Sequence, residues 1–273
     1  MNHNYSVLMS VYYKEQPQFL REAMNSILEQ TIPTNDFVLV CDGPLNEELD
    51  LVIEDMKLNF GSILNVVRLQ NNQGLGNALK IGLEYCKNSL VARMDSDDIC
   101  VPNRCELQLK NFTLDNRLAI ISGTVEQFTT HKDMVLGKRI VPSDYADIIT
   151  FSKRRNPFNH PAVMFKKEAV EKSGSYNNCY PLFEDYYLWV RMLQNGFRGK
   201  NLIETMVYMR TPVDMYKRRG GFLYAKNLLA FNNWMLRSKW ITISDYLFSA
   251  IPHAIVCVLP NSLRKFIYGH LHR

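Results

Sequence analysis

Short apolar runs alternate with amphipathic stretches over the first hundred residues of the chain. The runs have the length of buried strands, and they are residues 5–11, 37–41, 63–68 and 90–94. Apolar side chains at helical spacing predict helices over 19–28, about 47–59 and 74–87. Strands that alternate with helices indicate a parallel, doubly wound α/β sheet, in which ligands bind at the carboxyl ends of the strands.

The second half of the chain has a less regular pattern. We predict a strand over 119–130 with a bend at Gly123, a short strand over 161–165 and an amphipathic helix over 185–195. Residues 210–221 combine a proline, three consecutive basic residues and two glycines, so we interpret them as a mobile loop.

The composition is that of a globular protein, with 47% hydrophobic and 22% charged residues in a chain of 273. The net charge of +5 is concentrated at 153–155, at 217–219 and near the C-terminus. Such clusters suit local anion contacts or a membrane surface, and we expect no nucleic-acid partner because a broad basic stripe is missing.

Six cysteines without paired or zinc-type spacing indicate a reducing cytosol. We expect no signal peptide and no membrane-spanning helix.

A cluster of carboxylates follows the apolar run that ends at Met94. If the strand continues through this cluster, alternate residues face the same side of it. Asp95 and Asp97 could then contact one ligand, while Ser96 faces the other side. Carboxylates this close repel one another unless a positive charge lies between them. Mg²⁺ or Mn²⁺, bridging to substrate phosphates, fits that need; the alternative is a solvated acidic turn.

Residues 71–76, NNQGLG, precede a predicted helix and partly match a dinucleotide-binding fingerprint. The third glycine is missing, since Leu79 occupies its place, and the segment belongs to the third strand–helix unit. A nicotinamide site is therefore disfavoured. Two interpretations stay open: a tight start of a packed helix, or backbone amides that lie near a nucleotide.

Two acids, Glu184 and Asp185, begin the predicted helix at 185–195. Acids at this position cap a helix and complement its dipole. The large aromatic residues that flank them would also partly desolvate a carboxylate and make it a better base.

Six segments, taken in order, resemble the family 2 glycosyltransferases: SVLMSVYYKE, VCDGP, NNQGLGNALKIG, ARMDSDD, NHPAVMF and FEDYYLWVRML. Within that family the chain is similar to bacterial enzymes that build O-antigen, capsule and exopolysaccharide repeat units. The resemblance covers about residues 4–222. It implies a GT-A fold, that is, a Rossmann-like nucleotide-binding domain with a mixed, mainly parallel sheet, followed here by C-terminal helices. It also implies a nucleotide-sugar donor, Mn²⁺ or Mg²⁺ as cofactor, and inversion at the anomeric centre.

The resemblance also implies roles for individual residues. Five positions match residues that border the donor nucleotide in the family: Tyr12, Glu15, Asp42, Asn72 and Lys80. Among them, Asp42 matches the acid that hydrogen-bonds the uracil ring. Asp95 and Asp97 match the DxD pair, the second of which usually binds the metal directly. Asp185 matches the catalytic base, with Glu184 as its neighbour. His160 falls in a segment that borders the acceptor or metal site, and the alternative for it is a core histidine.

One departure from the family pattern is Cys41-Asp42-Gly43-Pro44, where many relatives have a second acid after the aspartate and a serine after the glycine. This departure leaves the predicted chemistry unchanged, but it puts in doubt how the nucleobase of the donor is recognised.

The basic loop at 210–221 is a candidate lid over the donor. The guanidinium groups of Arg218 and Arg219 suit a diphosphate, and the paired glycines give the backbone freedom to move. The alternative is a solvated basic turn.

These observations predict an inverting, metal-dependent glycosyltransferase that uses a UDP-sugar. A sugar-1-phosphate nucleotidyltransferase is the first alternative, but it requires a glycine- and basic-rich loop after the first strand, and residues 12–17 contain no glycine. A non-catalytic carbohydrate-binding relative is the second. We divide the chain into a catalytic domain, 1–222, and a C-terminal helical extension, 223–273.

The C-terminal extension contains a 14-residue run without charge, 246–259, broken by Pro252 and too short to span a membrane. In the segment that follows, Leu263, Phe266, Ile267 and Leu271 can share a helix face, with Arg264, Lys265 and Arg273 toward water or lipid phosphates. This predicts a peripheral protein on the cytoplasmic face of the cell membrane, which fits the lipid-diphosphate-linked saccharide acceptor that the resemblance implies. The alternatives are packing on the catalytic domain and a homodimer contact.

Overall fold

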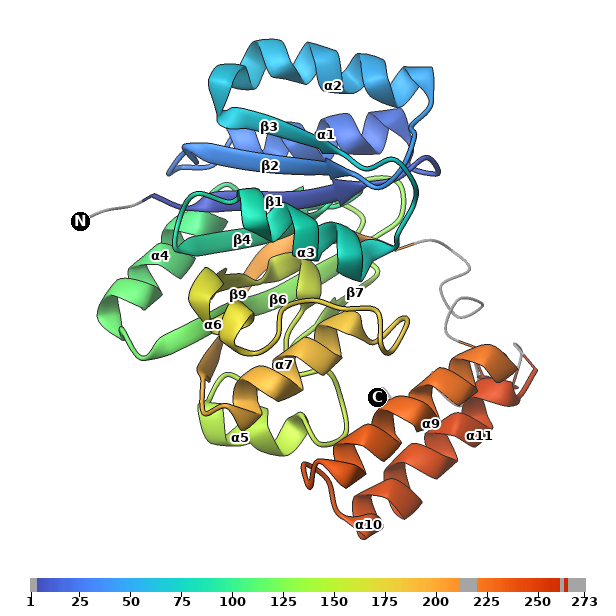
Figure 1. Ribbon diagram of the computed structural model, residues 1–273. Coiled ribbons are helices and arrows are strands. Elements are labelled where there is room, and N and C mark those ends of the chain that lie inside the picture. The colour runs from blue at the N-terminus through green and yellow to red at the C-terminus, as the bar shows by residue number, and fades with distance from the viewer. Residues whose placement is uncertain (1–3, 212–219, 261–262, 265–273) are drawn as a thin grey trace.

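The computed structural model describes residues 4–211, 220–260 and 263–264. Its core is one mixed sheet with the order β3-β2-β1-β4-β8-β6-β9-β5, and β7 pairs with β6 (Figure 1). The first four strands are parallel neighbours: β1 (Ser6–Val11), β2 (Asp36–Cys41), β3 (Leu64–Arg68) and β4 (Leu90–Asp95). The helices that connect them are α1 (Pro17–Leu28), α2 (Glu47–Phe60), with the 3₁₀ turn η1 (Gly61–Ile63) after it, and α3 (Leu75–Tyr85). All four strands and three helices predicted for this half are confirmed.

The second half completes the sheet with antiparallel and parallel pairs. Its strands are β5 (Ile99–Cys100), β6 (Leu118–Phe128), β7 (Gly137–Arg139), β8 (Met164–Lys166) and β9 (Arg198–Arg210). The expected bend at Gly123 coincides with a shift of register between β6 and β9. The strand expected over 161–165 is partly wrong, because a 3₁₀ turn, η2 (His160–Ala162), precedes β8. The fold class, a mixed and mainly parallel α/β sheet, is confirmed.

Helices cover both faces of the sheet. One core is shared by the sheet with α1, α2 and α4 (Arg104–Leu114), and the other with α3, α5 (Tyr145–Phe151), α6 (Lys167–Lys172) and α7 (Glu184–Gln194). The central strands therefore need apolar side chains on both sides. Along β1, Met9 packs toward the first core and Leu8 toward the second.

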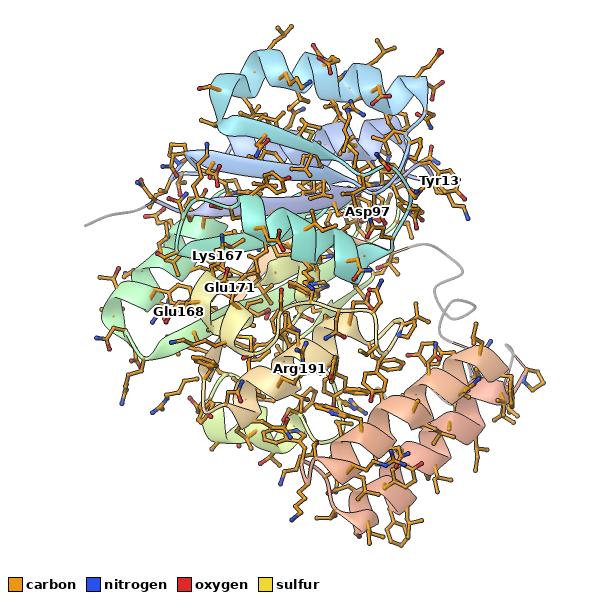
Figure 2. All side chains as sticks on the ribbon, in the orientation of Figure 1. Tyr13, Asp97, Lys167, Glu168, Glu171 and Arg191 are labelled. Atoms are coloured by element: carbon orange, nitrogen blue, oxygen red, sulfur yellow. The ribbon has the colours of Figure 1, made fainter. Side chains whose placement is uncertain are left out.

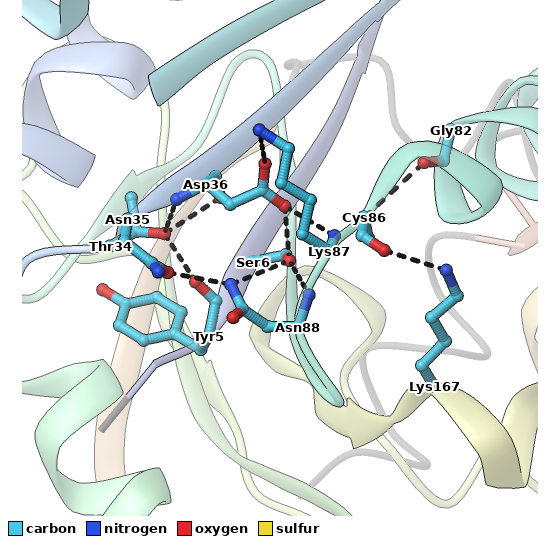
Figure 3. Close-up of polar contacts among 10 residues, drawn as sticks. All are labelled: Tyr5, Ser6, Thr34, Asn35, Asp36, Gly82, Cys86, Lys87, Asn88 and Lys167. Atoms are coloured by element: carbon cyan, nitrogen blue, oxygen red, sulfur yellow. Dashed lines mark hydrogen bonds and ion pairs between the residues drawn. The ribbon is translucent and has the colours of Figure 1, made fainter. Parts of the chain in front are cut away.

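A polar network ties the strands together at their amino ends (Figure 3). The fully buried carboxylate of Asp36 accepts hydrogen bonds from Ser6 Oγ at 2.6 Å and from the Lys87 N–H at 2.9 Å. The Lys87 ammonium lies 3.7 Å from the other carboxylate oxygen. Ser6 in turn accepts the N–H of Asn88, just before β4. This network holds β1, β2 and β4 in register at their amino ends. The candidate site residues lie at the opposite, carboxyl ends of these strands.

The described C-terminal helices form a hairpin that packs on α7. They are α9 (Phe222–Arg237), α10 (Ile243–Asp245), the π turn η3 (Tyr246–Ala250) and α11 (Ile251–Val258). Phe183 stacks on Phe231 with ring centroids 5.4 Å apart, and Tyr187 meets Trp234 edge-on at 4.5 Å. No helix in these described ranges is long and apolar enough to cross a bilayer.

One expectation about this region is met in part and another is wrong. Pro252 lies where the π turn η3 gives way to α11, so the helix changes type there without ending. Arg264 does not point to water: its side chain is buried, and Nη1 donates to the carbonyl of Cys257 at 3.1 Å. Residues 266–273, on which the second amphipathic face was predicted, lie outside the described residues.

Candidate active site

The aspartate cluster lies where β4 ends. The strand stops at Asp95, and Ser96 and Asp97 form a turn, so the expectation that Asp95 and Asp97 share one strand face is wrong. The two carboxylates are nevertheless close enough to interact. Burial, Asp95 and Glu15 together raise the pKa of Asp97 to about 7. Ser96 turns the other way and donates to the carboxylate of Glu15 at 2.5 Å.

A buried cation, Arg93, lies beneath this turn. Its guanidinium holds Asp95 through two hydrogen bonds, Nη1 to Oδ2 at 2.7 Å and Nη2 to Oδ1. The same charge favours the ionised forms of Asp97 and of both acids on α7. Arg93 therefore acts electrostatically on both the aspartate turn and the two acids at the start of α7. We did not predict a role for it; the available signal was a charged residue inside an apolar strand, two positions before Asp95.

A second arginine, Arg210, fixes the turn from the end of β9. Its guanidinium lies 3.8 Å from the ring centroid of Phe19 and 4.5 Å from that of Phe128. It donates to the carbonyl of Asp97 at 3.0 Å, and its own N–H donates to the buried carboxylate of Asp98 at 2.7 Å. This residue was also missed. Residues 212–219, including Arg218 and Arg219 of the expected lid, lie outside the described residues.

The acid expected to act as base, Asp185, lies in the first turn of α7. Its Oδ1 accepts the N–H of Tyr186 at 2.7 Å, and its Oδ2 accepts the side-chain amide of Asn156 at 2.6 Å. The first contact is a helix-start interaction, so part of the capping interpretation holds. The side chain is 17% exposed. Burial raises the pKa of Asp185, whereas these two hydrogen bonds oppose the rise.

Glu184 has a different environment from its neighbour. Burial and the charge of Asp185 raise the pKa of Glu184 to about 7. Asp185 also has Asn156 as a donor, whereas the hydrogen bonds that oppose the rise at Glu184 come from the backbone. The two acids therefore differ in how firmly the ionised form is held.

His160 lies beside Asp185 in a largely aromatic setting. Its Nε2 is 3.1 Å from the hydroxyl of Tyr176, and its ring meets that of Trp189 at 5.9 Å. Burial and the charge of Arg93 lower the pKa of His160 well below its usual value. The 4.0 Å separation between His160 Nδ1 and Asp185 Oδ2 is therefore a contact with a neutral imidazole, not an ion pair. The core interpretation of this residue is confirmed, and His160 also borders Asp185; its place at an acceptor or metal site stays a prediction.

The expected donor residues gather at the carboxyl ends of β1 and β2. Asp42 is buried, and its carboxylate accepts the N–H groups of Gln73 at 2.7 Å and Gly74 at 3.0 Å, just before α3. The side chain of Asn72 donates to the carbonyl of Asp42 at 3.1 Å. Gly43 is required beside it, because its φ is +89° and a Cβ would lie 2.7 Å from the Asn72 nitrogen.

The remaining donor candidates surround this loop. Tyr12 and Glu15 follow β1; Tyr12 is exposed, and Glu15 contacts the aspartate turn through Ser96. Lys80 is exposed on α3. Figure 2 shows Tyr13 and Asp97 on the side of the sheet where the parallel strands end.

Two carboxylates suit a site for a hard divalent cation that substrate and water complete, rather than a metal site closed by protein ligands alone. Among residues 4–211, 220–260 and 263–264, no group of three or more His, Cys, Asp or Glu side chains is placed to hold a metal. Mg²⁺ and its analogues commonly take one or two carboxylates and complete their shell with substrate phosphates and water. Asp97, with Asp95 beside it, fits this donor set.

Comparisons with known proteins agree with this arrangement. A family model described as Glycosyl transferase family 2 matches residues 6–174. A UDP-Gal:alpha-D-GlcNAc-diphosphoundecaprenol beta-1,3-galactosyltransferase of Escherichia coli is 39% identical and covers 98% of this chain and 96% of its own. The amylovoran biosynthesis glycosyltransferase AmsE of Erwinia amylovora is 34% identical over 97% of both chains.

A solved structure supports the fold. The mannosyltransferase PcManGT of Pyrobaculum calidifontis, in complex with GDP-Man and Mn²⁺, superposes with a TM-score of 0.67 at 17% identity and covers 98% of this chain and 79% of its own. The fold is therefore that of the GT-A glycosyltransferases, as the resemblance implied. By its sequence and its sheet, the chain belongs to the family 2 glycosyltransferases.

Proposed function

We propose that this glycosyltransferase moves a sugar from a UDP-sugar to a hydroxyl of a lipid-diphosphate-linked saccharide, with inversion and with a divalent cation. The observation that carries the proposal is the placement of two acidic groups around Arg93. Arg93 holds Asp95 of the aspartate turn through two hydrogen bonds, and its charge also acts on Asp97 and on Asp185. A donor diphosphate at the turn would thus face an acceptor hydroxyl at Asp185.

In the proposed reaction, Asp185 accepts the proton of the acceptor hydroxyl. The hydroxyl oxygen forms a bond to the anomeric carbon, and the bond from that carbon to the diphosphate breaks with its electron pair leaving on UDP. A positioned base contributes roughly 10²–10⁴-fold. Asn156 and the N–H of Tyr186 favour the ionised form of Asp185 that this step requires, against the effect of burial.

The aspartate turn would serve the leaving group. Asp97 and Asp95 would hold Mn²⁺ or Mg²⁺, which when bound neutralises charge on the departing diphosphate. Arg93 fixes the direction of the Asp95 carboxylate, and Arg210 fixes the backbone at Asp97. Asp42 shapes the loop at 71–76 and would contact the uracil ring, with Tyr12, Glu15, Asn72 and Lys80 around the nucleotide. This machinery would belong to a catalytic domain, residues 1–222, with residues 223–273 as its C-terminal extension.

The E. coli relative guides the choice of substrates, because its name specifies UDP-galactose and a GlcNAc-diphosphoundecaprenol acceptor. The purified protein is incubated with Mn²⁺, UDP-galactose and a GlcNAc-diphosphate carrying a short alkyl chain. We expect a disaccharide product with a β linkage, read from the anomeric proton coupling in NMR.

Other UDP-sugars are tested in parallel. Transfer of a nucleotidyl group, an α-linked product, or no transfer from any UDP-sugar would overturn the proposal. A product with a UDP-sugar other than UDP-galactose would leave the reaction class intact and change the donor.

A further inference from the structure

The C-terminal hairpin carries a concentration of exposed apolar side chains that the catalytic fold does not use. In the described part of the chain beyond residue 219, eight large hydrophobic residues are exposed: Phe222, Leu223, Ile243, Leu247, Phe248, Ile255, Val258 and Leu263. Phe248 is 81% exposed. An apolar surface of this kind on a folded protein indicates a contact with another apolar body.

These side chains lie on the outer side of the hairpin. Ala254 and Cys257 are buried against α9, whereas Ile255 and Val258, which follow each of them by one residue, are exposed. The start of α9 joins the same region, because the N–H of Gly221 donates to the carbonyl of Cys257 at 2.8 Å, which brings Phe222 to the end of α11. We call Phe222, Phe248, Ile255 and Val258 the outer apolar face.

The charge around this face has one sign. Residues 220–273 contain six lysines and arginines and a single acid, Asp245. That acid is paired with Arg154 of the catalytic domain at 3.2 Å. Lys226, Arg237 and Lys239 are exposed on the hairpin. A second copy of the chain would bring the same positive charge against this surface, whereas anionic lipid headgroups complement it.

The hairpin is fastened to the helix that begins with the proposed base. Phe183, the residue before Glu184, stacks on Phe231 of α9, and Tyr186 packs on the same ring at 4.8 Å. Figure 1 shows α9 and α11 beside the body of the sheet, with the start of α9 on the side where the parallel strands end. Through α9, the outer apolar face is therefore held in a fixed position relative to the start of α7.

We propose that the outer apolar face docks on an anionic lipid bilayer and thereby presents the start of α7 to the headgroup of a lipid-linked acceptor. The apolar side chains enter the boundary between headgroups and acyl chains, and Lys226, Arg237 and Lys239 contact lipid phosphates. The interface is made by a helical hairpin lying on the membrane. This proposal deepens the proposed function and rests on it for the nature of the acceptor.

The first test measures binding without activity. The full-length protein is sedimented at low salt with vesicles of phosphatidylcholine containing about one third phosphatidylglycerol, and separately with pure phosphatidylcholine. We expect binding to the anionic vesicles that weakens at high salt. Phe248→Ser alone should weaken it about tenfold or more, since burying a phenylalanine contributes roughly 1.5–3 kcal/mol. The triple variant Phe248→Ser, Ile255→Ser, Val258→Ser should abolish it.

A matched control replaces equally exposed apolar residues elsewhere. Leu51 and Leu58 are 68% and 84% exposed on α2, at the other end of the molecule. The variant Leu51→Ser, Leu58→Ser should bind vesicles as the wild type does. Equal losses in both variants, or a wild-type protein that stays in the supernatant with anionic vesicles, would overturn the proposal. So would a wild-type dimer that the triple variant converts to a monomer, because the face would then bind a second copy.

The second test separates this proposal from the proposed function. The triple variant should transfer sugar to a water-soluble short-chain acceptor at the wild-type rate and lose transfer to a long-chain acceptor embedded in vesicles. Equal transfer by both proteins to the embedded acceptor would overturn the docking role and leave the reaction in place. Vesicle binding by a protein that transfers to neither acceptor would instead overturn the proposed function.

Discussion

Asn156 donates a hydrogen bond of 2.6 Å from its side-chain amide to Oδ2 of Asp185. The side-chain carbonyl of Asn156 accepts the N–H of Phe158 at 3.4 Å, and its backbone carbonyl accepts a hydrogen bond from the Arg139 guanidinium at 3.1 Å, so the amide is itself held in place. With Oδ1 already bound to the N–H of Tyr186, both carboxylate oxygens have a donor. Asn156 is therefore a positioning residue for the proposed base, and it acts by fixing the direction of the carboxylate and favouring its charge.

Replacing this amide should change the pH dependence of the reaction. The hydrogen bond favours ionised Asp185, so Asn156→Ala should raise the pKa of the base further. The acidic limb of kcat/KM should then move to higher pH by about one unit, since a hydrogen bond to a charged group contributes roughly 1.5–3 kcal/mol before solvent replaces it. The rate on the alkaline plateau should change less. A lowered plateau with an unmoved limb would mean that Asn156 has only a structural role.

The two acids at the start of α7 should differ in their contribution to the rate. Asp185→Asn keeps the size of the side chain but cannot accept a proton, so we expect kcat to fall roughly 10²–10⁴-fold with normal folding and normal UDP binding. Glu184→Gln is the matched control and should keep activity within about tenfold. The opposite result, an inactive Glu184→Gln beside an active Asp185→Asn, would assign the base to Glu184.

The aspartate turn is tested by removing the metal and one carboxylate. EDTA should abolish transfer, and excess Mn²⁺ should restore it. Asp97→Ala should abolish transfer at every Mn²⁺ concentration, whereas Asp115→Asn, which changes a partly exposed acid paired with Arg117, should have no effect on transfer. Full activity in EDTA would exclude the proposed role of the cation. Recovery of Asp97→Ala at high Mn²⁺ would move the principal ligand to Asp95.

The sequence predicts the amino-terminal half of the fold well because its strands are apolar on both faces, which gives uninterrupted runs. It does not predict β9, whose sequence RGKNLIETMVYMR mixes exposed polar and buried apolar residues. The candidate acids could be proposed from the sequence because strand ends and helix starts can be read locally. The strand-face argument for Asp97 failed because a turn begins immediately after Asp95.

The residues that organise the site could not be found in this way. Arg210 reaches Glu22, which is 188 positions away in the chain, and Asn156 reaches Asp185 across 29 positions. Their contacts exist only once β9 and α7 are in place. Arg264 illustrates the opposite error: its spacing suggested an exposed face, but packing against the end of α11 buries it.

Arg93 should contribute to stability through its two-pronged contact with Asp95. Arg93→Lys keeps the charge but loses the planar fork, so we expect the free energy of unfolding to fall by about 1–3 kcal/mol in urea titrations. Arg117→Lys is the control, because Arg117 also makes a two-pronged contact with Asp115 but is exposed, and it should leave the stability unchanged. Equal losses in the two variants would show that the buried Arg93–Asp95 pair contributes no more to the free energy of unfolding than the exposed Arg117–Asp115 pair.

The raised pKa of Glu184 predicts a pH-dependent gain in stability when its charge is removed. A carboxyl whose pKa is about 7 in the folded protein, against an ordinary 4.5, binds a proton more readily folded than unfolded, so its charge costs stability as the pH rises through this interval. Glu184→Gln should therefore raise the free energy of unfolding at pH 8 by about 1–3 kcal/mol and by much less at pH 5. Glu48→Gln, at an exposed position on α2, should change neither value. A Glu184→Gln protein that is no more stable than wild type at pH 8 would show that the ionised side chain is well solvated at the start of α7.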